Sequence, residues 1–130
     1  MPVELRYLTY VTLLTALAWV PYILNEIMVR GLMDAVGYPS NPKPLAAWAQ
    51  RMKAAHYNAV ENLVIFATLI LIANAVGAFG HATAMCAVVY FWARAVHLAV
   101  YTFAIPWLRT LAFVAGVGAQ LCVAFQILGH

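Results

Sequence analysis

The chain has 130 residues, of which 66% are hydrophobic and only 8% are charged. Soluble domains carry about 25% charged residues, so this composition excludes a small soluble protein, which could not cover its exterior with polar side chains. The net charge of +3 is too small and too scattered to indicate a nucleic-acid-binding protein. The composition predicts an all-α integral membrane protein with one domain over residues 1–130, because about 20 apolar residues per span leave room for about four spans.

The first predicted span runs from about residue 5 to residue 29. Pro21 lies inside it and lacks a backbone N–H, so we expect the helix to bend there. The segment 16–18 (Ala-Leu-Ala) resembles a signal-peptide cleavage site, but the apolar run continues past it, which favours a retained span. Glu26 and Arg30 mark the exit with i,i+4 spacing. They form either an ion pair at a solvated helix end or a contact to a lipid head group or ligand.

The segment 37–44 holds the only cluster of Pro, Gly, Ser and Asn residues and predicts the one substantial loop. The second span, about residues 45–76, is longer than a bilayer requires. Its first part, through about Lys53, is therefore expected to project into water or the head-group layer. Residues 77–80 (Gly-Ala-Phe-Gly) predict a short turn.

The third span covers about residues 82–104, and Pro106 precedes a fourth span of about residues 107–128. The connection between them is so short that the two helices must be antiparallel neighbours. The fourth span contains small residues that favour close helix packing: Ala115, Gly116, Gly118 and Ala119. Cys86 and Cys122 lie inside apolar runs and are interpreted as packing residues rather than disulfide partners or metal ligands.

The cations near the predicted helix ends gather on one side of the membrane. The side that holds the first and third loops has Arg30, Lys43, Arg51, Lys53 and Arg109. The other side has only Arg6. By the positive-inside rule, both termini lie outside and these two loops lie in the cytoplasm.

Two charged residues, Glu61 and Arg94, lie well inside predicted spans, where each costs roughly 2.5–3.5 kcal/mol near the bilayer centre. The second and third spans are antiparallel neighbours, so Glu61 is the simplest partner for Arg94. Arg94, His97 and Tyr101 are spaced i, i+3, i+7 and share one helix face. The polar residues converge on a pocket in the cytoplasmic leaflet, lined by Arg51, Asn58, Glu61, Arg94, His97, Tyr101 and Arg109.

The excess of arginine in this pocket indicates a ligand with several carboxylates or phosphates, and the carboxylate of Glu61 favours an ammonium on the same ligand. No metal is predicted, because neither His56 nor His97 has thiolate or carboxylate companions at ligand spacing. A structural network that only fixes the helix register remains the alternative for the Glu61–Arg94 pair.

Three groups of residues carry a resemblance to a known family: Arg51, Asn58 and Glu61, then Arg94, His97 and Tyr101, then a proline turn and Arg109. This pattern resembles the MAPEG family, membrane-associated proteins in eicosanoid and glutathione metabolism, and is most similar to its prostaglandin E synthase branch. The resemblance covers most of the chain. It implies a homotrimer of four-transmembrane-helix bundles that binds glutathione near the cytoplasmic leaflet, between protomers.

The resemblance also implies roles for individual residues. Glutathione would contact Arg51, Asn58, Glu61, Arg94, His97 and Tyr101, with Arg30 reaching in from the neighbouring protomer. Arg109 would stabilise the glutathione thiolate, with Thr110 or Tyr101 as a hydroxyl donor. The chain departs from that branch at Ala54 and Tyr57, which replace arginines, and at Phe113, which replaces a tyrosine. The two lost cations weaken the expected binding of an anion.

The function implied is a membrane-embedded, glutathione-dependent transferase or peroxidase that acts on lipophilic electrophiles or hydroperoxides from the bilayer. A non-enzymatic lipid-binding or scaffold membrane protein of the same fold is the alternative. A small transporter or channel subunit is disfavoured, because the polar residues gather in one leaflet and nothing charged continues toward the outer side.

Overall fold

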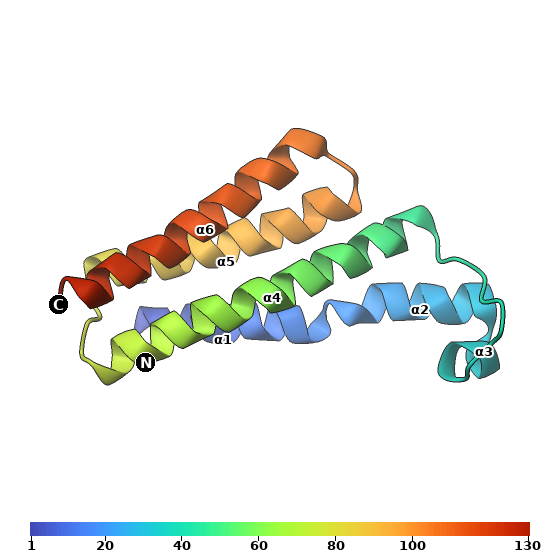
Figure 1. Ribbon diagram of the computed structural model, residues 1–130, viewed down its shortest axis with the longest axis horizontal. Helices are drawn as coiled ribbons and strands as arrows, with labels where there is room; N and C mark the ends of the chain where they lie inside the picture. The colour runs from blue at the N-terminus through green and yellow to red at the C-terminus, as the bar shows by residue number, and fades with distance from the viewer.

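The computed structural model describes all of residues 1–130 as a bundle of four helical rods (Figure 1). The first rod is α1 (Val3–Leu17) followed by α2 (Trp19–Arg30); the others are α4 (Ala47–Ala75), α5 (His81–Thr102) and α6 (Pro106–Leu128). Each rod is long and apolar enough to cross a membrane. The predicted class, an all-α four-helix membrane bundle, is confirmed, and the chain is an integral multi-pass membrane protein.

The two ends of the bundle differ in what they carry (Figure 1). One end, called the terminal end below, holds both chain termini and the turn between α4 and α5. The opposite end, called the loop end, holds the connection from α2 to α4 and the turn between α5 and α6. Pro106 is the first residue of α6, as predicted, since a first-turn position needs no N–H donor.

The first rod, Val3–Arg30, is the single span that was predicted at about residues 5–29, and it is interrupted at one residue, Ala18. α1 ends at Leu17 and α2 begins at Trp19. Pro21 cannot donate a hydrogen bond to the carbonyl of Leu17, and the helix is interrupted directly after Leu17, at Ala18. His56 of α4 braces the break: Nε2 donates to the Thr15 carbonyl at 2.8 Å, and Nδ1 accepts from the Tyr22 hydroxyl at 2.7 Å.

A short helix that was not predicted, α3 (Leu32–Val36), follows α2 at the loop end. Gly31 makes the turn possible, because its φ of 81° is a conformation that side chains with a Cβ rarely adopt. The extended loop then continues to Ala46, slightly beyond the predicted segment 37–44.

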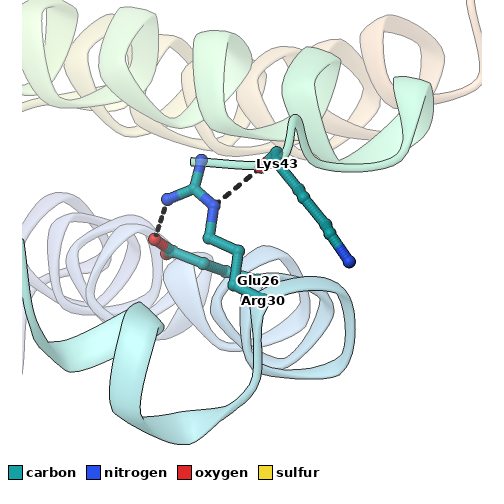
Figure 2. Close-up of polar contacts among 3 residues, drawn as sticks. All are labelled: Glu26, Arg30 and Lys43. Carbon is teal, nitrogen blue, oxygen red and sulfur yellow. Dashed lines mark hydrogen bonds and ion pairs between the residues drawn. The ribbon is translucent and has the colours of Figure 1, made fainter. Parts of the chain in front are cut away.

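Arg30 fastens this loop to the end of α2 (Figure 2). Its Nη1 donates to Glu26 Oε1 at 2.6 Å, and its Nε donates to the Lys43 carbonyl at 2.7 Å. The predicted i,i+4 pair of Glu26 with Arg30 is therefore confirmed. Asn25 adds a second tie, because its Oδ1 accepts from the backbone N–H of Ala46 at 3.0 Å.

The apolar core lies between α1, α4, α5 and α6, toward the terminal end. Phe66 and Tyr90 stack at its centre, with ring centroids 3.8 Å apart. Of the small residues predicted to pack α6 closely, Gly116 and Ala119 are buried, whereas Ala115 and Gly118 are exposed. A Cβ at Gly116 would lie 3.7 Å from Cδ of Arg94, so this glycine lies against the aliphatic stem of that arginine.

Cys86 and Cys122 are joined in a disulfide, which corrects the interpretation of both as packing residues. Cys86 lies near the start of α5 and Cys122 near the end of α6, so the bond links these antiparallel helices close to the terminal end. The Cα atoms lie 6.5 Å apart, within the range that a disulfide spans.

Reduction of this disulfide is expected to lower the midpoint of thermal unfolding in detergent. For a separation of 36 residues, the chain-entropy model gives a stabilisation by the disulfide of about 4 kcal/mol. This value is an upper bound, because helices that persist in the unfolded membrane state leave less chain entropy for the disulfide to remove. The variant with both Cys86→Ser and Cys122→Ser is the control and should not respond to reductant. Alkylation of both cysteines in unreduced wild-type protein would contradict the bond.

Candidate functional site

Polar side chains from α4, α5 and α6 surround a cavity of about 270 Å³ toward the loop end. Six residues line it: Asn58, His97, Tyr101, Arg109, Thr110 and Phe113. Five of these were predicted site residues, and Phe113 stands where the resemblance expected a tyrosine. The antiparallel packing of α5 on α6 through a short turn brings residues 97–101 beside residues 109–113.

Arg94 lies behind this cavity, with only 3% of its surface exposed. Its Nη2 donates to Asn58 Oδ1 at 2.8 Å and lies 3.4 Å from His97 Nδ1. Its Nε is buried and has no hydrogen-bond partner. The guanidinium therefore sits among the helices without a carboxylate, held by two neutral side chains.

These contacts fix which atoms Asn58 and His97 offer to the cavity. Asn58 Oδ1 is occupied as an acceptor, so its amide N–H groups remain to donate. His97 Nδ1 accepts from Arg94, which leaves the neutral ring with its proton on Nε2. Together with the hydroxyls of Tyr101 and Thr110, the lining consists mainly of hydrogen-bond donors.

Arg109 supplies the positive charge of the cavity. Its guanidinium carbon lies 4.8 Å from the centroid of the Tyr101 ring, a cation–π arrangement that orients the side chain. Tyr101 in turn packs edge-on against His97, with centroids 5.6 Å apart. The side chain of Arg109 makes no hydrogen bond within the chain, so its guanidinium N–H groups are free to bind an anion.

The predicted pairing of Glu61 with Arg94 is wrong. Glu61 is exposed on the outer face of α4, and the only ion pair in the structure is Arg30 with Glu26. Asn58 takes the place of Glu61 as the partner of Arg94 because it lies on the side of α4 that packs against α5. Neither Glu61 nor Arg94 lines the cavity.

The two remaining predicted residues, Arg51 and Arg30, also lie outside this cavity. Arg51 lines a neighbouring cavity of about 200 Å³, together with Tyr101 and Arg109. Arg30 is engaged with Glu26 and the loop backbone, so within one protomer it serves to hold the loop (Figure 2).

A row of amides that sequence reasoning missed extends the polar cluster deeper into the bundle. Asn62 Nδ2 donates to the Asn58 carbonyl at 2.9 Å, and Gln120 Nε2 of α6 donates to the Asn62 carbonyl at 3.1 Å. Tyr90 lies beside Gln120 at the end of this row. The signal was present in the sequence, since Asn62 follows Asn58 by one helical turn in an apolar span.

A comparison with known protein families matches the sequence model of the MAPEG family to residues 8–129. The match covers nearly the whole chain, including all four rods. A comparison with curated proteins finds no match.

A double-mutant cycle tests which residue of α4 is the partner of the buried guanidinium of Arg94. We expect Asn58→Ala and Arg94→Met to show a coupling energy of about 1–3 kcal/mol in unfolding, because each removes the partner of the other. Glu61→Ala combined with Arg94→Met is the matched cycle and should show a coupling of about 0.5 kcal/mol or less. A larger coupling energy between Glu61 and Arg94 than between Asn58 and Arg94 would contradict the assignment of Asn58 as the partner.

Proposed function

Because the chain belongs to the MAPEG family, whose members are commonly glutathione-dependent transferases and peroxidases, we propose that it is such an enzyme. Its reaction joins the thiol of glutathione to a lipophilic electrophile, or reduces a lipid hydroperoxide, within the membrane. The second substrate enters sideways from the bilayer. The observation that carries the proposal is the cavity in which Asn58, His97, Tyr101, Arg109 and Thr110 meet.

The chemistry of the lining supports glutathione as the ligand. Glutathione carries two carboxylates, and the cavity offers N–H groups from Asn58 and His97 rather than further acceptors. Arg94 acts through these two side chains, since its guanidinium holds both in the donor orientation without lining the cavity. An anionic ligand nearby would also offset the buried charge of Arg94, which has no carboxylate within the protein.

Arg109 is the residue proposed to activate the thiol. A free thiol has a pKa of about 8.5 and is mostly protonated at neutral pH. A guanidinium within hydrogen-bonding distance favours the thiolate, which is the nucleophile. Arg109 has no competing partner, and the hydroxyls of Thr110 and Tyr101 line the same cavity as further donors to the sulfur.

Assembly into a homotrimer is part of the proposal. Glu61 is exposed on a membrane-spanning helix, where a carboxylate in contact with lipid is costly. A cation or hydrogen-bond donor from a second copy of the chain would offset this cost and bring Glu61 to the edge of the glutathione site. Arg30 would reach that site from the neighbouring protomer with the N–H groups that its contacts to Glu26 and the Lys43 carbonyl leave free.

The proposed orientation has the loop end in the cytoplasm, in a bacterial inner membrane. Arg30, Lys43, Arg51, Lys53 and Arg109 all lie toward this end, as the positive-inside rule requires. The disulfide lies near the opposite end, in the leaflet that would then face an oxidising compartment. The thiol chemistry would therefore proceed on the reducing side.

A lipid-binding or scaffold protein is the second candidate, and two observations favour it. Ala54 and Tyr57 supply no charge where the prostaglandin E synthase branch has arginines, so affinity for an anion is reduced. An apolar groove of about 440 Å³ between α5 and α6, which includes Trp92 and Leu111, suits an acyl chain. Purified protein that neither gains thermal stability in millimolar glutathione nor conjugates an aryl halide would support this candidate.

Substitution of Arg109 tests the enzymatic proposal. We expect Arg109→Ala to lower turnover of glutathione with an aryl halide by about 10²-fold or more, because the developing negative charge on sulfur loses its stabilising donor. Glutathione binding, measured by calorimetry, should fall only modestly. Arg6→Ala removes a cation from the terminal end and should leave turnover unchanged. Unaltered turnover in Arg109→Ala would refute the role assigned to this arginine.

A further inference from the structure

The smaller cavity at the loop end is a separate space that shares a wall with the glutathione cavity. Its volume is about 200 Å³, and it is lined by Arg51, Arg109, Tyr101 and the turn from Ala104 to Pro106. Tyr101 and Arg109 line both cavities, so the two spaces meet at these side chains.

Two guanidinium groups supply its charge. Arg51 Nε donates to the Thr102 carbonyl at 2.9 Å, which fixes the side chain against the end of α5. Its two Nη groups make no hydrogen bond within the chain. The guanidinium of Arg109 lies against the Tyr101 ring and donates no hydrogen bond to an oxygen of the chain. The cavity therefore presents several N–H donors that lack partners.

No acidic side chain neutralises these two arginines. The four acidic residues are committed or placed elsewhere: Glu4 accepts from Thr83 at the terminal end, Glu26 pairs with Arg30, Asp34 lies on α3, and Glu61 is exposed on α4. Glu61 follows Arg51 by ten residues on one helix, a rise of about 15 Å. Arg109 faces the proposed thiolate, so Arg51 is the cation that remains without a counterion, and its free Nη groups favour an anionic group from a second ligand.

We propose that this cavity binds an oxyanion, a carboxylate or phosphate, carried by the second substrate, and that Arg51 selects for it. The inference rests on the proposed glutathione chemistry in the adjoining cavity. A liquid water molecule occupies about 30 Å³, so 200 Å³ accommodates an acidic head with a short stem. A molecule anchored there passes Arg109, where its electrophilic carbon meets the thiolate.

The reaction with a chloronitrobenzoate shows how the subsite would act. The carboxylate binds Arg51, and the thiolate sulfur attacks the ring carbon that carries chlorine. A carbon–sulfur bond forms, and chloride leaves with the electron pair of the broken carbon–chlorine bond. The thiol proton, lost when the thiolate formed, passes to solvent. Arg51 takes no part in bond making and acts only on the affinity for the acidic substrate.

The test compares chloronitrobenzoate with its uncharged amide in wild type and Arg51→Gln. We expect Arg51→Gln to raise KM for the benzoate about tenfold or more and to change KM for the amide little, since one charge-assisted contact is lost. The benzoate and the amide differ in intrinsic reactivity, so for each substrate the KM of the variant is divided by the KM of the wild type. Arg51→Lys should recover part of the loss. Lys53→Gln is the matched control, because Lys53 lies on the same turn of α4 but stands over Tyr57, outside the cavity.

An equal loss for benzoate and amide would overturn the proposal, because it would mean that Arg51 holds glutathione or only the end of α5. A binding measurement without glutathione separates this inference from the enzymatic one. Benzoate should stabilise the wild-type protein against heat more than the amide does, even if no turnover occurs, and Arg51→Gln should abolish the difference. The absence of any difference in wild type would refute the subsite.

The oxyanion could also come from a lipid head group, and the membrane composition distinguishes the two sources. Both substrates are measured in nanodiscs of phosphatidylcholine, with and without phosphatidylglycerol. If the KM for benzoate stays below that for the amide when phosphatidylglycerol is present, the result supports a substrate subsite. A preference that disappears would assign the cavity to lipid and contradict the proposal.

Discussion

The buried guanidinium of Arg94 is the constraint around which the loop-end half of the bundle is arranged. It is 3% exposed and has no carboxylate partner, so the bundle must supply neutral acceptors and close packing instead. Asn58 and His97 provide the acceptors, and Gly116 allows α6 to approach the arginine stem. The same contacts turn Asn58 and His97 toward the cavity as donors. One unbalanced charge thereby determines both helix packing and the chemistry of the site.

Different interactions stabilise the two ends of the bundle. At the terminal end, the disulfide and the stacked pair of Phe66 with Tyr90 hold the helices through covalent and apolar contacts. At the loop end, hydrogen bonds hold them while cations and donors remain free for a ligand. This division allows an incompletely satisfied polar site inside a membrane protein, because the other half of the bundle maintains the helix arrangement without it.

The spans could be predicted from the sequence because they follow from hydropathy, and helical spacing brought Asn58, His97 and Tyr101 together. Three residues predicted for the same pocket, Arg51, Glu61 and Arg94, lie outside the cavity. The partner of Arg94 could not be predicted. Asn58 and Glu61 are close on the helix wheel of α4, and a modest rotation of that helix decides which faces α5. The disulfide was missed for a related reason: it requires Cys86 and Cys122 to reach the same depth on antiparallel helices, which spacing alone does not fix.

We propose that glutathione binds in the cavity where Asn58 and His97, oriented by Arg94, present N–H donors. Arg109 lines the same cavity and would contact the sulfur. The most direct measurement is a cryo-electron microscopy or crystal structure of the protein with saturating glutathione. We expect the sulfur within hydrogen-bonding distance of Arg109 and a glutathione carboxylate beside Asn58 or His97. Glutathione bound elsewhere on the protein, or a site left empty at saturating concentration, would contradict it.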